Sequence, residues 1–210
     1  MPEPKRSRPT RSVPPAIPPL LMPQPAIAPL VPPVHVVDLM TEAGSALFGA
    51  RWRAKEAKIV ECPALSDAMP EFRTTYDIEP HAEERGFDDS DWPVVPASEL
   101  EAKRGGGMVS FFWFRTTLTM PADAAGAMAV FRVNVDDYAE VWVDGELPRA
   151  SGRPSPGTIQ GFNMPHRLVL GNPVAAGDRF EIAVFAINGP ISAAPANFLW
   201  FREAKIEFFR

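Results

Sequence analysis

Between Phe111 and Gly145 apolar and polar side chains alternate with a period of two, and this pattern most constrains the fold. It covers three segments, residues 111–120, 129–135 and 138–143, and the Asp-Gly pair that follows is typical of a two-residue hairpin turn. A half-buried antiparallel strand alternates in this way, whereas a helix repeats about every 3.6 residues. The stretch therefore predicts three consecutive strands of one β-sandwich, the last two tightly joined.

Further short strands are expected on both sides of this stretch. Residues 180–187 are apolar on nearly both faces, which suits a central strand. Before the stretch, an extended piece leads to Thr41, which resembles the N-cap of a short helix that Gly44 interrupts early. The other predicted strands cover residues 50–61, 73–79, 167–170 and 198–209. Many short strands with turns between them and little helical period predict an all-β jelly-roll sandwich over residues 34–210.

The first 33 residues form a separate region, because twelve of them are proline. Proline restricts its own backbone and that of the residue before it, so this arm should be extended and could reach on the order of 100 Å. Free linkers favour Ser, Gly and charge, whereas residues 12–37 contain no Asp, Glu, Lys or Arg. A disordered tail and a docking arm are the two alternatives, and we expect a docking arm. Its predicted partner-binding residues are Ile17, Leu20, Leu21, Met22, Ile27, Leu30 and Val31.

The formal net charge of −5 disfavours a nucleic-acid partner, which requires a basic field. Four basic residues near the start could instead touch an acidic partner or anionic headgroups. No secretory leader or membrane-spanning helix is expected, because proline interrupts every apolar stretch of the arm. We expect a cytoplasmic protein that could lie peripheral to a membrane complex. The four basic residues near the start are Lys5, Arg6, Arg8 and Arg11.

No catalytic constellation emerges from the sequence, so we expect a chain that is not an enzyme. The three histidines show no zinc-binding spacing, and the single cysteine, Cys62, has no basic sequence neighbour to activate it. Asp136 or Asp137 with Glu140 could form a glycosidase carboxylate pair, but solvated outer-face charges are the favoured interpretation. A calcium interpretation of Asp88, Asp89 and Asp91 lacks the EF-hand spacing, and a capped turn that holds Trp92 is favoured.

Four segments in order, GFDDSDWPVV, WFRTTLTMP, DDYAEVWVDGE and GDRFEIAVFAIN, resemble the sugar-binding jelly roll of family 2 glycoside hydrolases, a galactose-binding-domain-like fold. The segments DDYAEVWVDGELPR, GFNMPHRLVL, AVFAINGPIS and PANFLW are also similar to the non-catalytic sandwich module of some gluconolactonase-like proteins. Neither a glycosidase barrel nor a lactonase propeller is in the chain. The resemblance therefore implies a module that binds sugars, packs against enzymes or joins assemblies. It also allows a structural calcium ion, although no ligands can be assigned and no other cofactor is expected.

Two functions follow from these patterns. The leading prediction is a non-catalytic adaptor or structural subunit that reaches the protein subunits of a larger complex through its arm. The alternative is a carbohydrate-binding module that serves a separately encoded lactonase or glycosidase. By residue type, the sugar-binding candidates at one end of the sandwich are Trp92, Arg153, Asn163, His166 and Asn188.

Overall fold

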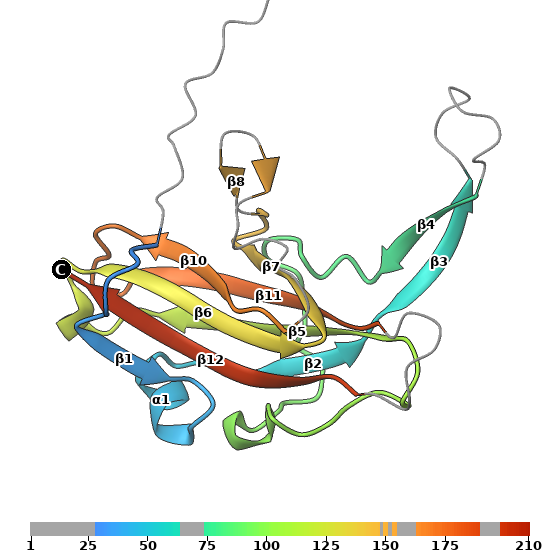
Figure 1. Cartoon of the computed structure of the whole chain (residues 1–210), viewed down its shortest axis with the longest axis horizontal. Coiled ribbons are helices and arrows are strands. Elements are labelled where there is room, and N and C mark those ends of the chain that lie inside the picture. The colour runs from blue at the N-terminus through green and yellow to red at the C-terminus, as the bar shows by residue number, and fades with distance from the viewer. Residues whose placement is uncertain (1–27, 64–73, 148, 151–152, 155–162, 190–197) are drawn as a thin grey trace, which may run out of the picture.

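The computed structural model describes residues 28–63, 74–147, 149–150, 153–154, 163–189 and 198–210. Within these ranges the chain forms two four-stranded antiparallel sheets that pack face to face (Figure 1). Sheet A has the strand order β1-β12-β6-β10, and sheet B has the order β2-β5-β11-β7. This arrangement confirms the predicted all-β sandwich.

The elements fall into the two sheets, two small ribbons and three short helices. Sheet A contains β1 (His35–Asp38), β6 (Met128–Asp136), β10 (His166–Gly171) and β12 (Trp200–Phe209). Sheet B contains β2 (Arg53–Glu56), β5 (Ser110–Thr119), β7 (Tyr138–Val143) and β11 (Arg179–Asn188). The ribbons pair β3 (Lys58–Pro63) with β4 (Thr74–Glu79), and β8 (Arg149–Ala150) with β9 (Arg153–Pro154). The helices are α1 (Glu42–Leu47), η1 (Ala97–Glu99) and η2 (Ala122–Ala124).

The main core lies between the sheets and is built from the alternating positions that the sequence indicates. Phe114 and Leu118 of β5 face Phe131 and Val133 of β6, and all four side chains are fully buried. The predicted central strand is also confirmed, because β11 pairs with β5 on one side and with β7 on the other. Burial of this apolar surface is the main favourable term for the fold, since the lone cysteine is free.

The outer face of sheet B carries a second core, which the prediction of a half-exposed β5 missed. Residues 80–92, the flap, cover this face with Ala82 and Trp92, which pack with Trp113 of β5 and Phe185 of β11. Arg115 of β5 is only 5% exposed, and its guanidinium donates to the Ala82 carbonyl and to Asp89 Oδ2 at 3.1 Å. The guanidinium therefore ties the flap to the sheet.

Residues 50–61 form two strands rather than the single predicted one. β2 pairs with β5 as far as Phe112, and the Ala57 N–H then donates to the Phe111 carbonyl at 2.8 Å. Because β5 begins at Ser110, the chain beyond Ala57 has almost no further strand to pair with. It leaves the sheet as β3, and the β3–β4 ribbon projects from the sandwich (Figure 1).

Helix α1 begins as predicted but does not break at Gly44. Thr41 is the N-cap, and its Oγ1 accepts from the Gly44 N–H at 3.0 Å. A β-carbon at Gly44 would lie 1.9 Å from the carbonyl oxygen of Asp38. The glycine therefore allows the helix to pack against the end of β1 instead of interrupting it.

The predicted hairpin turn is confirmed, but the strands before it separate. Asp144 and Gly145 have φ values of 52° and 79°, and Val143 and Glu146 exchange two hydrogen bonds of 3.0 Å. β6 and β7 are joined through Asp137 alone, yet they belong to different sheets. The tight junction is thus a crossing between the two layers of the sandwich.

Candidate functional site

The first described residues, 28–34, lie against sheet A as an irregular segment with bends at Leu30, Val31 and Val34, which we call the strap (Figure 1). At one end, Arg167 of β10 donates from Nη1 to the carbonyl oxygen of Pro29 at 2.7 Å. At the other end, the Val34 N–H donates to the Phe208 carbonyl at 2.8 Å, and the chain continues into β1. The strap is therefore held at both ends, by the edge strand β10 and by the inner strand β12 of sheet A.

The anchor of the strap is a buried ion-pair cluster on the outer face of sheet A. The Glu207 carboxylate, in a residue only 4% exposed, accepts from Arg167 Nη2 at 2.6 Å and from Arg132 Nη1 at 3.3 Å. The Arg167 guanidinium also lies 5.7 Å from the ring centre of Phe209. A buried charge is tolerated when it is paired and hydrogen-bonded, and this pairing fixes Arg167 where it meets Pro29.

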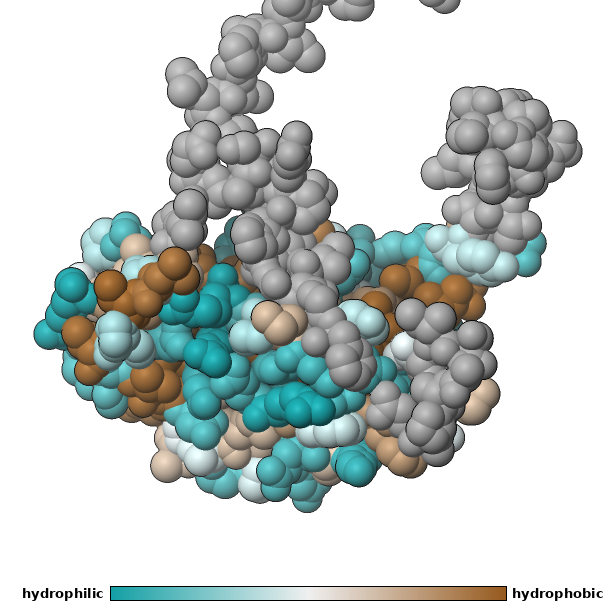
Figure 2. All heavy atoms as spheres, viewed as in Figure 1, coloured by the Kyte–Doolittle hydropathy of each residue, from teal (hydrophilic) through white to brown (hydrophobic). Residues whose placement is uncertain are grey.

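The strap presents apolar side chains to solvent. Leu30 is 97% exposed and Val31 63% exposed, whereas Pro29 is half-buried. Val34 and Val36 continue the exposed surface onto β1, and we call these four side chains the strap patch. Figure 2 shows apolar residues at this end of the molecule, beside a hydrophilic strip across the middle of the same face. Contiguous exposed apolar side chains of this kind mark interaction surfaces.

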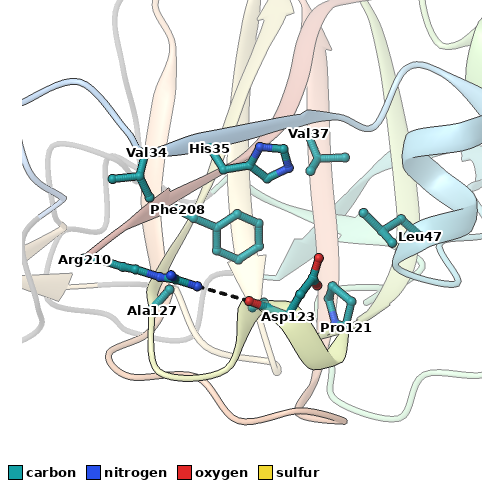
Figure 3. Close-up of a pocket in the computed structure, with 10 residues that line it drawn as sticks. Val34, His35, Val37, Leu47, Pro121, Asp123, Ala127, Phe208 and Arg210 are labelled. Atoms are coloured by element: carbon teal, nitrogen blue, oxygen red, sulfur yellow. Dashed lines mark hydrogen bonds between the residues drawn. The ribbon is translucent and has the colours of Figure 1, made fainter.

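A pocket of about 470 Å³ adjoins the strap patch around strand β1 (Figure 3). Phe208 lies at its centre, with its ring stacked on that of His35 at 6.2 Å between centroids. Arg210 donates from Nη2 to the carbonyl oxygen of Asp123 at 3.3 Å across one side. The lining residues are Val34, His35, Val37, Leu47, Pro121, Asp123, Ala124, Ala127, Phe208 and Arg210. The pocket is large enough for an apolar side chain of a partner.

Of the predicted arm residues, Leu30 and Val31 are described, and both belong to the strap patch. The other five, Ile17, Leu20, Leu21, Met22 and Ile27, lie outside the described residues. Binding of a partner by these side chains stays a prediction.

Three of the predicted sugar-binding residues, Asn163, His166 and Asn188, lie together where β6 passes into β7. The Asn163 N–H donates to the Asp137 carbonyl at 2.9 Å. The N–H of Gly189, the residue after Asn188, donates to Asp137 Oδ2 at 3.2 Å. His166 and Asn188 are 2% and 0% exposed, and Asn188 Nδ2 donates to the Met108 carbonyl at 2.5 Å. This polar end of the sandwich is a cluster of buried hydrogen-bonding groups.

Among the described residues, the buried side-chain oxygens of Asn134 and Asn163 at the polar end have no hydrogen-bond partner. Asn134 Nδ2 donates to the Asn163 carbonyl at 2.9 Å, so the two residues are direct neighbours. Asn163 has a φ of 56°, a left-handed conformation that asparagine tolerates better than most residues. Buried acceptors normally have partners, but both oxygens are shielded from solvent, so a ligand hydroxyl could reach them only after neighbouring groups move apart.

The other two sugar-binding candidates do not join this cluster. Trp92 is 3% exposed and packs edge-on against Phe87 in the second core, with Lys55 Nζ 5.8 Å from its ring centre. It has no free ring face for a sugar in this structure. Arg153 belongs to β9, and its side chain lies outside the described residues.

Asp136 and Glu140, which the sequence suggests as a possible glycosidase carboxylate pair, belong to different sheets. Asp136 ends β6 and forms an ion pair with Arg202 of β12. Glu140 lies on β7, where burial raises the pKa of its carboxyl, the nearby Trp142 indole partly offsets the rise, and nearby Glu83 adds to it. The structure therefore does not bring the two carboxylates together as one reacting pair.

The three aspartates of the predicted capped turn bind different protein partners. Asp88 accepts from the Ser90 N–H at 3.0 Å, Asp89 pairs with Arg115, and Asp91 pairs with Lys55 at 3.1 Å. Within the described ranges no group of three or more His, Cys, Asp or Glu side chains is placed to hold a metal ion. Over the same residues, no helix is both long and apolar enough to cross a membrane.

No protein-family model and no curated protein matches the sequence. Among solved structures, the chain is similar to a glycosyl hydrolase family 2 member from Bacteroides cellulosilyticus, with 12% identity and a TM-score of 0.49 over 83% of the chain. It is also similar to a β-glycosidase from Bacteroides vulgatus (13%, TM-score 0.48, 83% of the chain) and to Bacteroides uniformis β-glucuronidase 2 (14%, TM-score 0.46, 83% of the chain). The chain spans 20%, 20% and 18% of the lengths of these proteins.

The family named by the sequence resemblance is thus found again among solved structures. The similarity to modules of gluconolactonase-like proteins stays a prediction. The fold assignment rests on the strand order and register described above.

Proposed function

We propose that this chain is a non-catalytic β-sandwich subunit that docks on a larger protein assembly through its arm and the strap patch. One observation carries the proposal: Leu30 is 97% exposed although the strap on both sides of it is hydrogen-bonded to the sandwich. A large aliphatic side chain held rigidly in water gains by burial on a partner, and the ordering cost of its backbone is already met.

The neighbouring surface supports the same function. The strap patch continues into the pocket around β1, so a partner could cover Val34 from one side and place an apolar side chain beside Phe208 on the other. The uncharged sequence of residues 12–37 also favours an apolar protein surface over solvent. We place the docked subunit at the periphery of its complex, which could be a membrane complex.

Native purification of the tagged full chain tests this function. We expect one stoichiometric partner assembly, and we expect deletion of residues 1–33 to abolish co-purification while the sandwich stays folded. The Leu30→Ser/Val31→Ser variant should also be lost from the assembly. Unchanged retention of the deletion variant would refute docking through the arm.

The second candidate function is carbohydrate binding at the polar end, and the paired oxygens of Asn134 and Asn163 favour it. A sugar would supply hydroxyl donors for these acceptors. Calorimetric titration of the full chain with monosaccharides tests this function. Binding at millimolar or lower concentration that is lost in Asn163→Ala, but kept in Leu30→Ser/Val31→Ser, would favour the carbohydrate function.

A further inference from the structure

The outer face of sheet A places three cations side by side on neighbouring strands. Lys205 of β12 is the register partner of Arg132 of β6, and Arg132 is in turn the partner of Arg167 of β10. We call these three side chains the cationic row. Like charges directly opposite each other destabilise a sheet, so the row has a cost for the fold that nearby carboxylates must offset.

The carboxylates that offset the row are less exposed than its cations. Glu203 and Glu207 lie two positions before and after Lys205 on β12, and they accept from Arg132 at 2.7 and 3.3 Å. The side chains of these two glutamates are 14% and 6% exposed, whereas those of Arg132 and Lys205 are 35% and 34% exposed. The positive groups are therefore what this part of the face presents to solvent.

The row keeps hydrogen-bond donors for another molecule. Arg132 donates from Nε and Nη1 to the two glutamates, and among the described residues its Nη2 has no acceptor. Lys205 has three donors, of which Glu203 takes one at 3.1 Å. On the other side of Lys205, the register partner Asp38 uses Oδ1 to accept from a backbone N–H. An added carboxylate can therefore bind without breaking the bonds that hold the row.

The strap patch borders the cationic row at both ends. Val36, one of the four patch side chains, is the register partner of Glu207, two positions from Lys205. At the other end of the row, Arg167 donates to the Pro29 carbonyl of the strap. Figure 2 shows the hydrophilic strip beside the apolar end of the same face. A partner that covers the strap patch therefore meets the row as well.

We infer that the partner is a protein segment in which carboxylates alternate with aliphatic side chains, and that one carboxylate binds Arg132 and Lys205 while the aliphatic side chains cover the strap patch. The inference rests on the proposed docking function and specifies the chemistry of its partner. A carboxylate forms strong charge-assisted hydrogen bonds with such cations, and complementary charge beside an apolar patch gives a docking surface its specificity.

A protein carboxylate fits the row better than a surface of phosphates. The chain has a formal net charge of −5, and Asp38, Glu203 and Glu207 surround the row. An anionic bilayer or a nucleic acid extends well beyond three cations, so it would be repelled by the rest of the molecule. A single carboxylate needs only the local donors.

The test titrates the isotope-labelled full chain with two capped five-residue peptides, one of alternating leucine and glutamate and one with glutamine in place of glutamate. NMR follows the Nε–H signal of Arg132 and the backbone amides of β12. We expect the glutamate peptide to shift these signals and to bind roughly tenfold more tightly than the glutamine peptide. Its affinity should fall several-fold when NaCl is raised from about 50 to about 300 mM, because salt screens the charges.

Three variants locate the two parts of the surface. Lys205→Gln should weaken the glutamate peptide about two- to fivefold and leave the glutamine peptide unchanged. Leu30→Ser/Val31→Ser should weaken both peptides equally, because it removes only apolar contacts. Arg179→Gln, which removes an exposed arginine from β11 of the other sheet, is the matched control and should change neither peptide.

The outcomes separate this inference from the docking function. If the two peptides bind equally well, or if the Arg132 signal does not move, the acidic partner is overturned. Docking through the strap patch still stands in that case if Leu30→Ser/Val31→Ser is lost from the native assembly. If this variant and the deletion of residues 1–33 are both retained, the docking function fails and the inference fails with it. Co-sedimentation with phosphatidylcholine–phosphatidylglycerol vesicles that is lost in Lys205→Gln would assign the row to anionic headgroups and overturn the protein partner.

Discussion

At the scale of single residues, Gly44 is the position where the smallest change should have a large effect. Replacing glycine with alanine in a helix usually stabilises it by up to about 1 kcal/mol. Here the added carbon would lie 1.9 Å from the Asp38 carbonyl oxygen, which is backbone and cannot move aside easily. We expect Gly44→Ala to lower the free energy of unfolding by about 1–3 kcal/mol, as overpacking does, measured by urea denaturation. Ala46→Gly is the control, with a loss no larger than about 1 kcal/mol, and a Gly44→Ala variant as stable as the parent would contradict this packing.

His81 is a second residue with a measurable consequence. Both ring nitrogens face carboxylates, Nδ1 at 2.8 Å from Glu83 and Nε2 at 3.3 Å from Asp77. The hydrogen bond with Glu83 and the charges of both carboxylates raise the pKa of His81 above its ordinary value of 6.5, against a smaller opposing effect of burial. The stabilisation is therefore complete below pH 6.5 and is lost as pH rises through the higher folded-state pKa.

The pKa of His81 can be followed by NMR titration of its imidazole protons. We expect a midpoint above 6.5, and a lower one in Glu83→Gln, because that change removes the larger cause of the shift. The side chain is 48% exposed, so the effect on stability should stay within about 0.5 kcal/mol. A midpoint that does not move in Glu83→Gln would rule out this pairing.

At the scale of elements, the flap depends on Arg115. Its guanidinium holds the Ala82 carbonyl and Asp89 from a position only 5% exposed. We expect Arg115→Met to lower the free energy of unfolding by about 2–3 kcal/mol. The Ala82 carbonyl and Asp89 would then lose their buried, charged hydrogen-bond donor. Arg179→Met is the matched control, since that arginine lies on β11 of the same sheet but is exposed, and its loss should cost under about 0.5 kcal/mol. Equal losses in urea denaturation would show that the flap does not depend on Arg115.

The strap depends on Arg167 in the same way. We expect Arg167→Ala to increase hydrogen exchange at the amide of Val34, which donates to the Phe208 carbonyl, by about tenfold or more, because the strap is then no longer held at Pro29. Arg167→Lys, which keeps the charge but cannot reach both partners with one planar group, should give an intermediate rate. If exchange at the Val34 amide is as fast in the parent protein as in Arg167→Ala, the strap is not held by the hydrogen bond of Arg167 to Pro29.

The sequence was sufficient for the strands whose pattern is local. The alternation over residues 111–120 predicts β5, the apolar run over 180–187 predicts β11, and the cap at Thr41 and the Asp-Gly turn follow from known turn chemistry. The break at Ala57 could not be predicted, because it is set by where β5 begins, more than 50 residues later in the chain. Local periodicity does not contain that information.

The candidate site was predicted only in part for the same reason. Asn163, His166 and Asn188 were selected by residue type and do meet, but Trp92 was selected by the same criterion and lies in the second core. Arg167 and Glu207 were missed, since an arginine and a glutamate 40 positions apart give no signal until β10 and β12 are placed in one sheet.

At the scale of the whole molecule, the arm and the sandwich should separate in stability measurements. We expect removal of residues 1–27 to leave the melting temperature within about 2 °C of the full chain, because the strap and both described cores begin after that point. Removal of residues 1–34 should lower it by several degrees, since the strap then no longer bonds to Phe208 and Arg167. Equal melting temperatures for the two deletions would show that the strap contributes no stability.

The strap also determines when the fold of this protein can be completed during synthesis. Residues 28–38 leave the ribosome before their hydrogen-bond partners, since Arg167 lies 138 positions after Pro29 and strand β12 comes later still. The nascent chain must therefore carry the strap unpaired until these strands have emerged. During that interval the strap is open to chaperones or to an early encounter with its eventual partner.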